Sequence, residues 1–258
     1  LNARNIRVSV LRQLSKYLIS LGTDAYIPKL FQSKEISEAH AFTGDELLAF
    51  FENLDNLEPV RQSYGVRLLN ECKVLFRLYY CCGMRLNEPL QLIWECLDLQ
   101  AGTLRILQSK GDKDRILWLT DDIIDMLKKY RAYIQNERPD TNWVFPGTKE
   151  DNHLSDVSVR DYFLRAWTDT PYSRNSNPPT IKSFRHTFVV DRLNSWMEDG
   201  ENIETKLPYL SKFLGHANIQ ESLYYYHQVA ESFKIIHAKD KTSGLVIPEV
   251  NFNEKKDN

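Results

Sequence analysis

The distribution of strand and helix patterns constrains the fold of this chain most, because only residues 95–119 carry a clear β pattern. Leu104 and Ile106 precede a Lys-Gly-Asp-Lys turn, and an apolar run from Ile116 to Leu119 follows it, which predicts a β-hairpin. Elsewhere apolar residues recur at spacings of three and four, the period of an amphipathic helix. We therefore expect a mainly α fold with a small antiparallel β-sheet, of the α+β class.

Helical patterns lie on both sides of the hairpin. They are predicted at residues 5–21, about 44–54, 58–82, 86–93, 120–136, 155–168, 181–198, 206–214, 219–227 and 229–238, and residues 143–146 are predicted to be extended. A Thr43-Gly44-Asp45-Glu46 capping box begins the second helix, Gly83 ends the third and Thr120 caps the one after the hairpin. Because residues 29–42 lack periodicity, we place a domain boundary near residue 40.

The composition is that of a soluble globular protein, with 258 residues, 42% of them hydrophobic and 26% charged. The sequence has no apolar run of the roughly 18 residues that a membrane span needs and no N-terminal secretion signal. We expect a cytoplasmic, reducing location and reduced, buried cysteines. Because the chain opens on Leu1 in the middle of a helical pattern, we expect it to be part of a longer protein.

Positive charge gathers at the N-terminal end. Residues 1–34 hold Arg4, Arg7, Arg12, Lys16, Lys29 and Lys34 against Asp24 alone, which is 6 − 1 = +5. With a net charge of −2, the rest of the chain carries −2 − 5 = −7. This asymmetry fits either a surface for nucleic acid or a solvated helix face.

Several side chains in the helical region could bind an anion. Arg85 follows Gly83 and precedes Glu88 by three residues, so that the carboxylate could hold the guanidinium rigid for a ligand or simply pair with it. Lys110 lies at the tip of the hairpin, where it could reach a ligand or remain solvated. Lys182 and Arg185 open a helix on one face, where two cations oppose the helix dipole unless an anion or solvent screens them.

Two further features follow near the C-terminal end. His216, after Leu214-Gly215, could donate a hydrogen bond or move a proton, or could be structural. Three tyrosines, Tyr224, Tyr225 and Tyr226, are adjacent. Because successive helical residues point about 100° apart, at least one of them should be exposed.

Taken together and in order, these residues resemble the tyrosine recombinase, or phage integrase, family. The family has an Arg, a hairpin Lys, a His-x-x-Arg-His box, a Leu-Gly-His box and a nucleophilic Tyr nine residues later. The corresponding residues are Arg85, Lys110, Arg185-His186, Leu214-Gly215-His216 and Tyr225. The resemblance covers residues 43–238, with one departure: Lys182 stands where the family has His. A lysine does not accept a proton at pH 7 unless its pKa is strongly lowered.

The resemblance implies a role for each matching residue. The catalytic set would be Arg85, Lys110, Lys182, Arg185, His216 and the nucleophile Tyr225, supported by Glu88 and His186. Contacts with DNA would come from Arg7, Arg12, Lys16 and Lys113. The reaction would pass through a 3′-phosphotyrosine intermediate and would need no metal and no cofactor.

The resemblance also implies domains and partners. Residues 1–40 would be the end of a helical core-binding domain plus a linker, residues 41–242 the catalytic domain, and residues 243–258 a C-terminal tail that docks in trans. The partners would be double-stranded DNA with specific recombination sites and further copies of the chain in a homo-tetramer, with no membrane.

Three other readings are open to the same sequence. A type IB topoisomerase-like enzyme would use a similar residue set to relax supercoils as a monomer. A catalytically impaired accessory protein of the same fold would bind DNA without forming an adduct, and Lys182 is the residue that favours it. A helical scaffold with no DNA role would bind no duplex at any salt concentration.

Overall fold

The structure, a computed structural model, describes residues 2–31, 39–60, 64–107, 114–149 and 151–216. The chain divides into two compact units, Leu1–Ala39 and His40–Asn258. The described residues are mostly helical, with one three-stranded antiparallel sheet, which confirms the fold class expected from the sequence.

The first unit consists of helix α1 (Asn2–Ser20) and an extended segment that runs back along it. The Asn5 side chain bonds both backbone groups of Phe31, Arg12 donates to the Pro28 carbonyl, and Ser15 donates to the Tyr26 carbonyl. Polar side chains of the helix therefore hold the segment. The apolar stripe of α1 is largely exposed, at Ile6, Val10 and Leu14.

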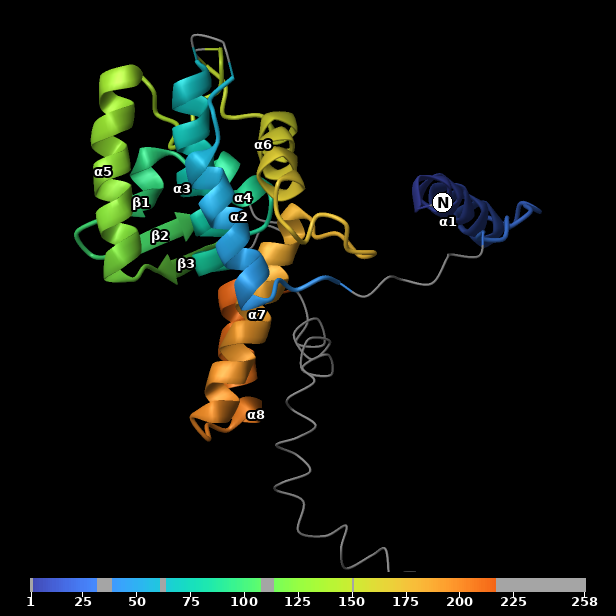
Figure 1. The fold of residues 1–258 in the computed structure, drawn as a ribbon. Helices are drawn as coiled ribbons and strands as arrows, with labels where there is room; N and C mark the ends of the chain where they lie inside the picture. The colour runs from blue at the N-terminus through green and yellow to red at the C-terminus, as the bar shows by residue number, and fades with distance from the viewer. Residues whose placement is uncertain (1, 32–38, 61–63, 108–113, 150, 217–258) are drawn as a thin grey trace, which may run out of the picture. The chain divides into compact units, whose positions relative to one another are not determined.

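The second unit is built from seven α-helices in its described part (Figure 1). They are α2 (Gly44–Asn56), α3 (Gly65–Cys82), α4 (Asn87–Leu90), α5 (Asp121–Glu137), α6 (Asp156–Thr168), α7 (Ile181–Glu198) and α8 (Ile203–Leu214). Helix α3 lies between α5 and α6 in Figure 1 and also packs against α7. The predicted capping box at Thr43 is present: its side chain accepts from the Glu46 N–H, and Glu46 accepts from the Thr43 N–H.

The sheet has the order β1 (Leu97–Asp98), β2 (Thr103–Ile106) and β3 (Arg115–Trp118). In the β2–β3 pair Leu104 faces Leu117, and both are buried. Strand residues alternate between the two faces of a sheet. Ile116 and Trp118 therefore point outward and are exposed, while Arg115 shares the inward face with Leu117.

Two apolar clusters hold the second unit together. The larger one surrounds α3 and contains packed rings of Phe50, Phe76, Phe163 and Phe184. The smaller one joins α7 to α8 through Phe188, Val189, Leu193, Met197, Leu207, Leu210 and Leu214. Helix α7 contributes to both clusters, so it fixes α8 relative to the main core.

The structure corrects several predicted boundaries. The helix predicted from residue 58 begins at Gly65, because Pro59 disfavours helical backbone at Glu58 and the chain crosses close to Gly65, where a Cβ would clash with the Val60 carbonyl. The helix predicted at 86–93 is the single turn of α4 followed by a 3₁₀ turn, Trp94–Cys96.

Smaller differences concern individual side chains. Thr120 occupies the N-cap position of α5, but its side chain makes no capping hydrogen bond. Three of the four cysteines are buried as expected, whereas Cys81 is exposed on α3. The predicted extended segment at 143–146 contributes two isolated β-bridges, from Trp143 to Ile93 and from Pro146 to His153. The helices predicted at 219–227 and 229–238 lie outside the described residues.

Candidate active site

The site is built around the C-terminal end of α8. Gly215 adopts the left-handed conformation there, with φ of 65°. The His216 N–H donates to the Ser211 carbonyl at 2.9 Å, and the Gly215 N–H donates to the Lys212 carbonyl at 3.1 Å. This pair of bonds is the Schellman motif that ends many helices. It leaves the next three carbonyls, those of Phe213, Leu214 and Gly215, without partners from the helix backbone.

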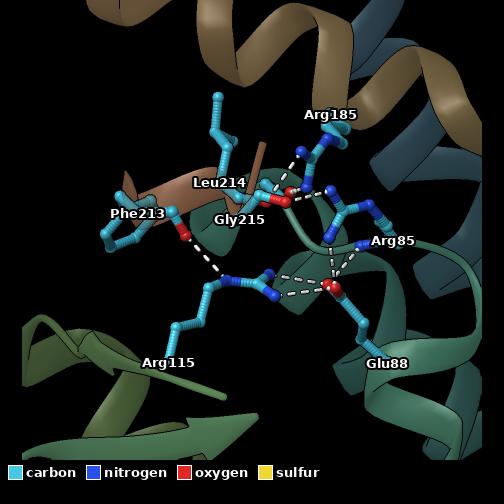
Figure 2. A network of polar contacts seen from close by, with 8 residues as sticks. Arg85, Glu88, Arg115, Arg185, Phe213, Leu214 and Gly215 are labelled. Carbon is cyan, nitrogen blue, oxygen red and sulfur yellow. Dashed lines mark hydrogen bonds and ion pairs between the residues drawn. The ribbon is translucent and has the colours of Figure 1, made fainter. Parts of the chain in front are cut away.

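Three arginines donate to these three carbonyls, one to each (Figure 2). Arg115 Nε lies 2.7 Å from the Phe213 oxygen, Arg185 Nη2 lies 2.9 Å from the Leu214 oxygen, and Arg85 Nη2 lies 2.5 Å from the Gly215 oxygen. The C-terminal end of a helix carries partial negative charge, which favours cations there. The end of α8 therefore gathers guanidinium groups from three separate parts of the chain.

Glu88 links two of these arginines. Its Oε1 accepts from Arg115 Nη1 at 2.8 Å and from Arg85 Nη1 at 2.9 Å. Its Oε2 accepts from Arg115 Nη2 and from the Arg85 backbone N–H, each at 2.7 Å. Burial alone would raise the pKa of Glu88, but the hydrogen bonds and charges of Arg115 and Arg85 outweigh burial and lower the pKa below its ordinary value. Three arginines and one carboxylate give this cluster a net charge of 3 − 1 = +2.

Arg185 ties the cluster to the end of α3. Its Nη1 donates to the Gly83 carbonyl at 2.8 Å, while Nη2 holds α8. Gly83 has φ of 57°, and a Cβ on it would collide with the Phe188 ring. The sharp turn after α3 therefore depends on glycine, and this turn carries Arg85 to the site two residues later.

The arginines differ in how far they reach solvent. The side chains of Arg115 and Glu88 are only 6% and 7% exposed, and Arg185 is also buried. The Arg85 side chain is 26% exposed. Its contacts with Glu88 and Gly215 use two of the five N–H donors of a guanidinium group. Arg85 is therefore the arginine of this cluster best placed to meet an anion from solution.

Two histidines lie within reach of these charges. Burial, then the charges of Arg185, Arg85 and Arg115, lower the pKa of His216 to about 4. Burial, then Arg185 and Lys182, lower the pKa of His186 to about 4 as well. Both imidazoles are therefore neutral at pH 7, and a neutral imidazole offers one N–H donor and one acceptor nitrogen.

The structure brings together many of the site residues expected from the sequence. Arg85, Glu88, Arg185 and His216 meet at the end of α8, and the predicted Arg85–Glu88 ion pair is present. Lys182 lies exposed in the first turn of α7, one turn before Arg185 and His186. Lys110, Lys113 and Tyr225 lie outside the described residues.

Three of the residues predicted to contact DNA belong to the first unit, Leu1–Ala39. Arg7 and Lys16 are exposed on α1, whereas Arg12 is partly buried and donates to the Pro28 carbonyl at 2.5 Å. Among the residues that the structure describes, no group of three or more His, Cys, Asp and Glu side chains is placed to hold a metal ion.

Arg115 is the site residue that sequence reasoning missed. The pattern of β3 contains one available signal: Arg115 shares the inward face of the strand with Leu117, while apolar Ile116 and Trp118 point outward. A charged residue at an inward position needs a buried partner. That partner, Glu88, lies 27 residues earlier in the chain.

A groove lies beside the site. It has a volume of about 1140 Å³ and lies between the sheet and α8, with His216 among the residues that line it. Exposed Ile116, Trp118 and Tyr209 line it, together with Arg105 and Lys212. Its lining is therefore apolar with cations among the aromatic and aliphatic side chains.

Comparisons with known proteins agree on one family. The sequence model of the phage integrase family matches residues 41–232. The integrase/recombinase y4eF of Sinorhizobium fredii is 31% identical over 146 residues, which cover 57% of this chain and 52% of that protein. The chain thus spans about half the length of this curated relative.

Solved structures show the same fold. The XerH site-specific recombinase bound to its difH substrate before cleavage matches with a TM-score of 0.61 and 24% identity, over 89% of this chain and 62% of that one. A lambda integrase tetramer bound to a Holliday junction matches with a TM-score of 0.59 and 18% identity, over 84% of this chain and 59% of that one. None of the described helices is both long and apolar enough to span a membrane.

Proposed function

The chain belongs to the phage integrase family, and we propose that it is a site-specific DNA recombinase that cuts and rejoins strands through a covalent phosphotyrosine. The observation that carries this proposal is the cluster at the end of α8. There Arg85 and Arg185 meet close to His216, which precedes Tyr225 by nine residues in the sequence. Family membership supplies the reaction class, and the cluster supplies a binding site for the phosphate under attack.

The cluster suits the charge that develops during strand cleavage. When a nucleophile attacks a phosphodiester, negative charge grows on the non-bridging oxygens. Donors fixed in advance where that charge grows contribute roughly 3–4 kcal/mol each in comparable anion sites. Arg85 and Arg185 are held by backbone carbonyls and by Glu88 before any substrate arrives, so little reorganisation is needed.

His216 has a distinct role in this proposal. Because its pKa is about 4, the imidazole is neutral and donates one N–H to the same phosphate rather than adding a charge. Lys182 replaces the histidine that the family pattern has three residues before Arg185. It lies exposed at the start of α7, from where it donates to a phosphate oxygen. His186 supports the site as a second neutral ring.

In the covalent step the Tyr225 oxygen forms a bond to phosphorus and gives its phenolic proton to water, and the bond from phosphorus to the 5′ oxygen breaks. Lys110 donates the proton that the departing 5′ oxygen needs. The new 3′-phosphotyrosine conserves the energy of the linkage, so a 5′ hydroxyl from another strand can reverse the step and exchange strands. The proposal uses no metal and no cofactor.

The partners in this proposal are duplex DNA and further copies of the chain. Arg7, Arg12, Lys16 and Lys113 contact DNA phosphates, with Arg7 and Lys16 the most exposed of those described. The chain acts as a homo-tetramer on two specific recombination sites in the cytoplasm of a prokaryote, at the nucleoid. Support for the tetramer comes from the lambda integrase tetramer on a Holliday junction, which shares the fold.

The domain division in the proposal follows function. Residues 1–40 end a core-binding domain, residues 41–242 form the catalytic domain, and residues 243–258 dock on a neighbouring copy. The apolar segment Leu245-Val246-Ile247-Pro248 is suited to the groove beside His216, because Ile116, Trp118 and Tyr209 are exposed there.

A trapping experiment tests the reaction class. The chain is incubated with short nicked duplexes of randomised sequence, in which a released fragment diffuses away and leaves the protein attached to DNA. We expect a covalent adduct that resists denaturation, and mass spectrometry should place the DNA on Tyr225. The variant Tyr225→Phe should form no adduct, while Tyr224→Phe and Tyr226→Phe, which keep the neighbouring rings, should still form it.

Other outcomes decide between the alternatives. Salt-dependent duplex binding with no adduct from the unaltered chain would favour a DNA-binding accessory protein. An adduct together with relaxation of a supercoiled plasmid, but no joining of two recombination sites, would favour a topoisomerase-like enzyme. An adduct that survives in Tyr225→Phe would contradict the assignment of the nucleophile.

A further inference from the structure

We propose that Arg115 is a positioning residue that keeps Arg85 available to the DNA phosphate, by occupying both oxygens of Glu88 and by holding the end of α8. This inference rests on the proposed recombinase function. It concerns a residue that belongs to none of the matched family boxes and lies on β3 rather than beside Arg85 in the sequence.

The first step of the argument is competition for Glu88. Arg115 places Nη1 and Nη2 at 2.8 and 2.7 Å from the two carboxylate oxygens, in a two-pronged ion pair. The Arg85 side chain then reaches only Oε1, through Nη1, and its Nη2 turns to the Gly215 carbonyl. Without Arg115, both terminal nitrogens of Arg85 could turn to the carboxylate. Arg115 therefore sets the direction in which the Arg85 guanidinium points.

The second step is charge. Arg85 and Glu88 alone would form a neutral pair, which would stabilise little of the negative charge that grows on the attacked phosphate. Arg115 adds one positive charge, so that the three groups together carry 2 − 1 = +1. Its Nε and both terminal nitrogens are bound to Phe213 and Glu88, and its side chain is only 6% exposed, so little of Arg115 is open to a DNA phosphate. The effect of Arg115 on the substrate must therefore pass through Arg85 and through the charge of the site.

The third step is the link between elements. Arg115 is the first residue of β3, the strand that follows Lys110 in the sequence. Its Nε donates to the Phe213 carbonyl at 2.7 Å, and its terminal nitrogens bind Glu88 on α4. One side chain therefore connects β3, α8 and α4 (Figure 2). These segments are far apart in the chain, since Arg115 and Phe213 are 98 positions apart.

The geometry needs arginine rather than any cation. Three nitrogens of one planar group serve three acceptors at fixed angles: Nε for Phe213 and the two terminal nitrogens for Glu88. A lysine carries its charge on a single nitrogen and cannot reproduce this fork. Lysine at position 115 would keep the charge but lose the orientation.

The experiment compares Arg115→Met, Arg115→Lys and a control, Arg160→Met, with the unaltered chain. Arg160 lies on α6, is exposed and pairs only with Asp156 among the described ion pairs, at 3.5 Å, so its loss removes a cation without touching the cluster. Circular dichroism and thermal melting measure folding. Duplex affinity and the rate of adduct formation at saturating protein are measured on the DNA recovered from the trapping experiment.

We expect adduct formation to slow by about tenfold or more in Arg115→Met, because misplacing a catalytic group by about 1 Å can cost more than that. Arg115→Lys should recover only part of the rate. Duplex affinity and its salt dependence should stay within about twofold of the unaltered chain in both variants, since the three guanidinium nitrogens of Arg115 are bound within the protein and add no phosphate contact. Arg160→Met should match the unaltered chain in rate.

Three outcomes would overturn the inference. Unchanged rates in Arg115→Met and Arg115→Lys would show that Arg85 needs no positioning. A fall in duplex affinity as large as the fall in rate would make Arg115 a DNA contact. If Arg115→Met does not fold, Arg115→Lys decides, and failure of both to fold would make Arg115 a purely structural residue. Absence of adduct from the unaltered chain would instead contradict the proposed function itself.

Discussion

His216 loses its charge because of its surroundings, and this has a consequence for stability. Burial, then the charges of Arg185, Arg85 and Arg115, lower its pKa from the ordinary value of 6.5 to about 4 in the folded chain. The unfolded chain therefore binds more protons at this residue between pH 6.5 and pH 4. Under proton linkage, the contribution of His216 is fully present above pH 6.5 and is lost as the pH falls toward 4.

We predict that His216→Gln makes folding less sensitive to acid. A shift of 6.5 − 4 = 2.5 pKa units corresponds to roughly 3.4 kcal/mol. The ring is only partly buried, so solvent screening reduces this, and we expect about 1 kcal/mol between pH 7 and pH 5. Urea unfolding at both pH values measures the loss. The unaltered chain should lose about 1 kcal/mol more than the variant.

The comparison with the variant is essential, because other groups titrate in the same range. His186→Gln serves as a second case, since burial and the charges of Arg185 and Lys182 lower the pKa of His186 to about 4 too. Titration of the imidazole signals by NMR gives the pKa directly. A midpoint near 6.5 for His216, or equal acid sensitivity in variant and unaltered chain, would contradict the arrangement of charges described above.

Sequence reasoning at this scale succeeds where contacts are local. Arg85 and Glu88 are three residues apart, so their spacing alone predicts the ion pair that the structure contains. The pairing of Arg115 with Glu88 depends instead on the register of β3 against β2 and on the position of α4. No spacing rule connects residues 27 positions apart, and only the alternation of β3 could have marked Arg115.

At the scale of elements, the end of α8 organises the arginines. The Schellman turn at Gly215 leaves three carbonyls free for Arg115, Arg185 and Arg85. A Cβ at Gly215 would lie 3.0 Å from Arg115 Nη1 and 3.2 Å from Arg85 Nη1. The glycine is therefore required twice, once for its left-handed backbone and once for the close approach of two side chains.

We predict that Gly215→Ala slows adduct formation by about tenfold, because it displaces Arg85 and Arg115 in the proposed phosphate site. Gly200→Ala is the matched control: Gly200 follows α7 with φ of 70°, and a Cβ there would meet nothing within 4 Å. Both variants should lose about 1 kcal/mol from backbone strain. Gly215→Ala should lose more, and urea unfolding together with trapping kinetics measures both effects.

Equal stability and equal rates in the two glycine variants would mean that the arginines adjust without cost. The stability of Gly215→Ala reports on α8 as a whole, because the small apolar cluster that α8 shares with α7 holds this helix in place. If only stability fell and the rate did not, α8 would support the fold without organising the site.

Element prediction from the sequence worked where a helix has a clear period and a clear end. The capping box at Thr43 and the left-handed glycines at Gly83 and Gly215 mark ends that the structure contains. The two-residue strand β1 is too short to show a period, so the sheet has three strands where a hairpin was predicted. Helix α3 begins at Gly65 and not at the predicted residue 58, because Pro59 and the close approach of Val60 to Gly65 outweigh the apolar pattern.

For the whole molecule, the fold class follows from the sequence, whereas the assembly does not. Helical periods dominate the chain, and one short β region can form only one small sheet. A surface that contacts another copy of the chain produces no such periodic pattern in the sequence. The outward side chains of β3, Ile116 and Trp118, have the pattern of a buried strand in the sequence, yet they are 57% and 72% exposed in this chain alone. Their exposure fits a surface that another segment covers.

We predict that deleting residues 243–258 weakens assembly on DNA and leaves monomer chemistry intact. Burying each apolar side chain of Leu245-Val246-Ile247 contributes roughly 1.5–3 kcal/mol, so losing the segment should lower the tetramer fraction at least tenfold. Trp118→Ser in the full chain should reproduce this by altering the groove instead of the tail. Analytical ultracentrifugation on duplexes with two sites measures assembly, and trapping measures cleavage. An unchanged tetramer fraction in the deletion variant would refute docking in trans, and a change with the deletion but not with Trp118→Ser would place the tail on a different surface.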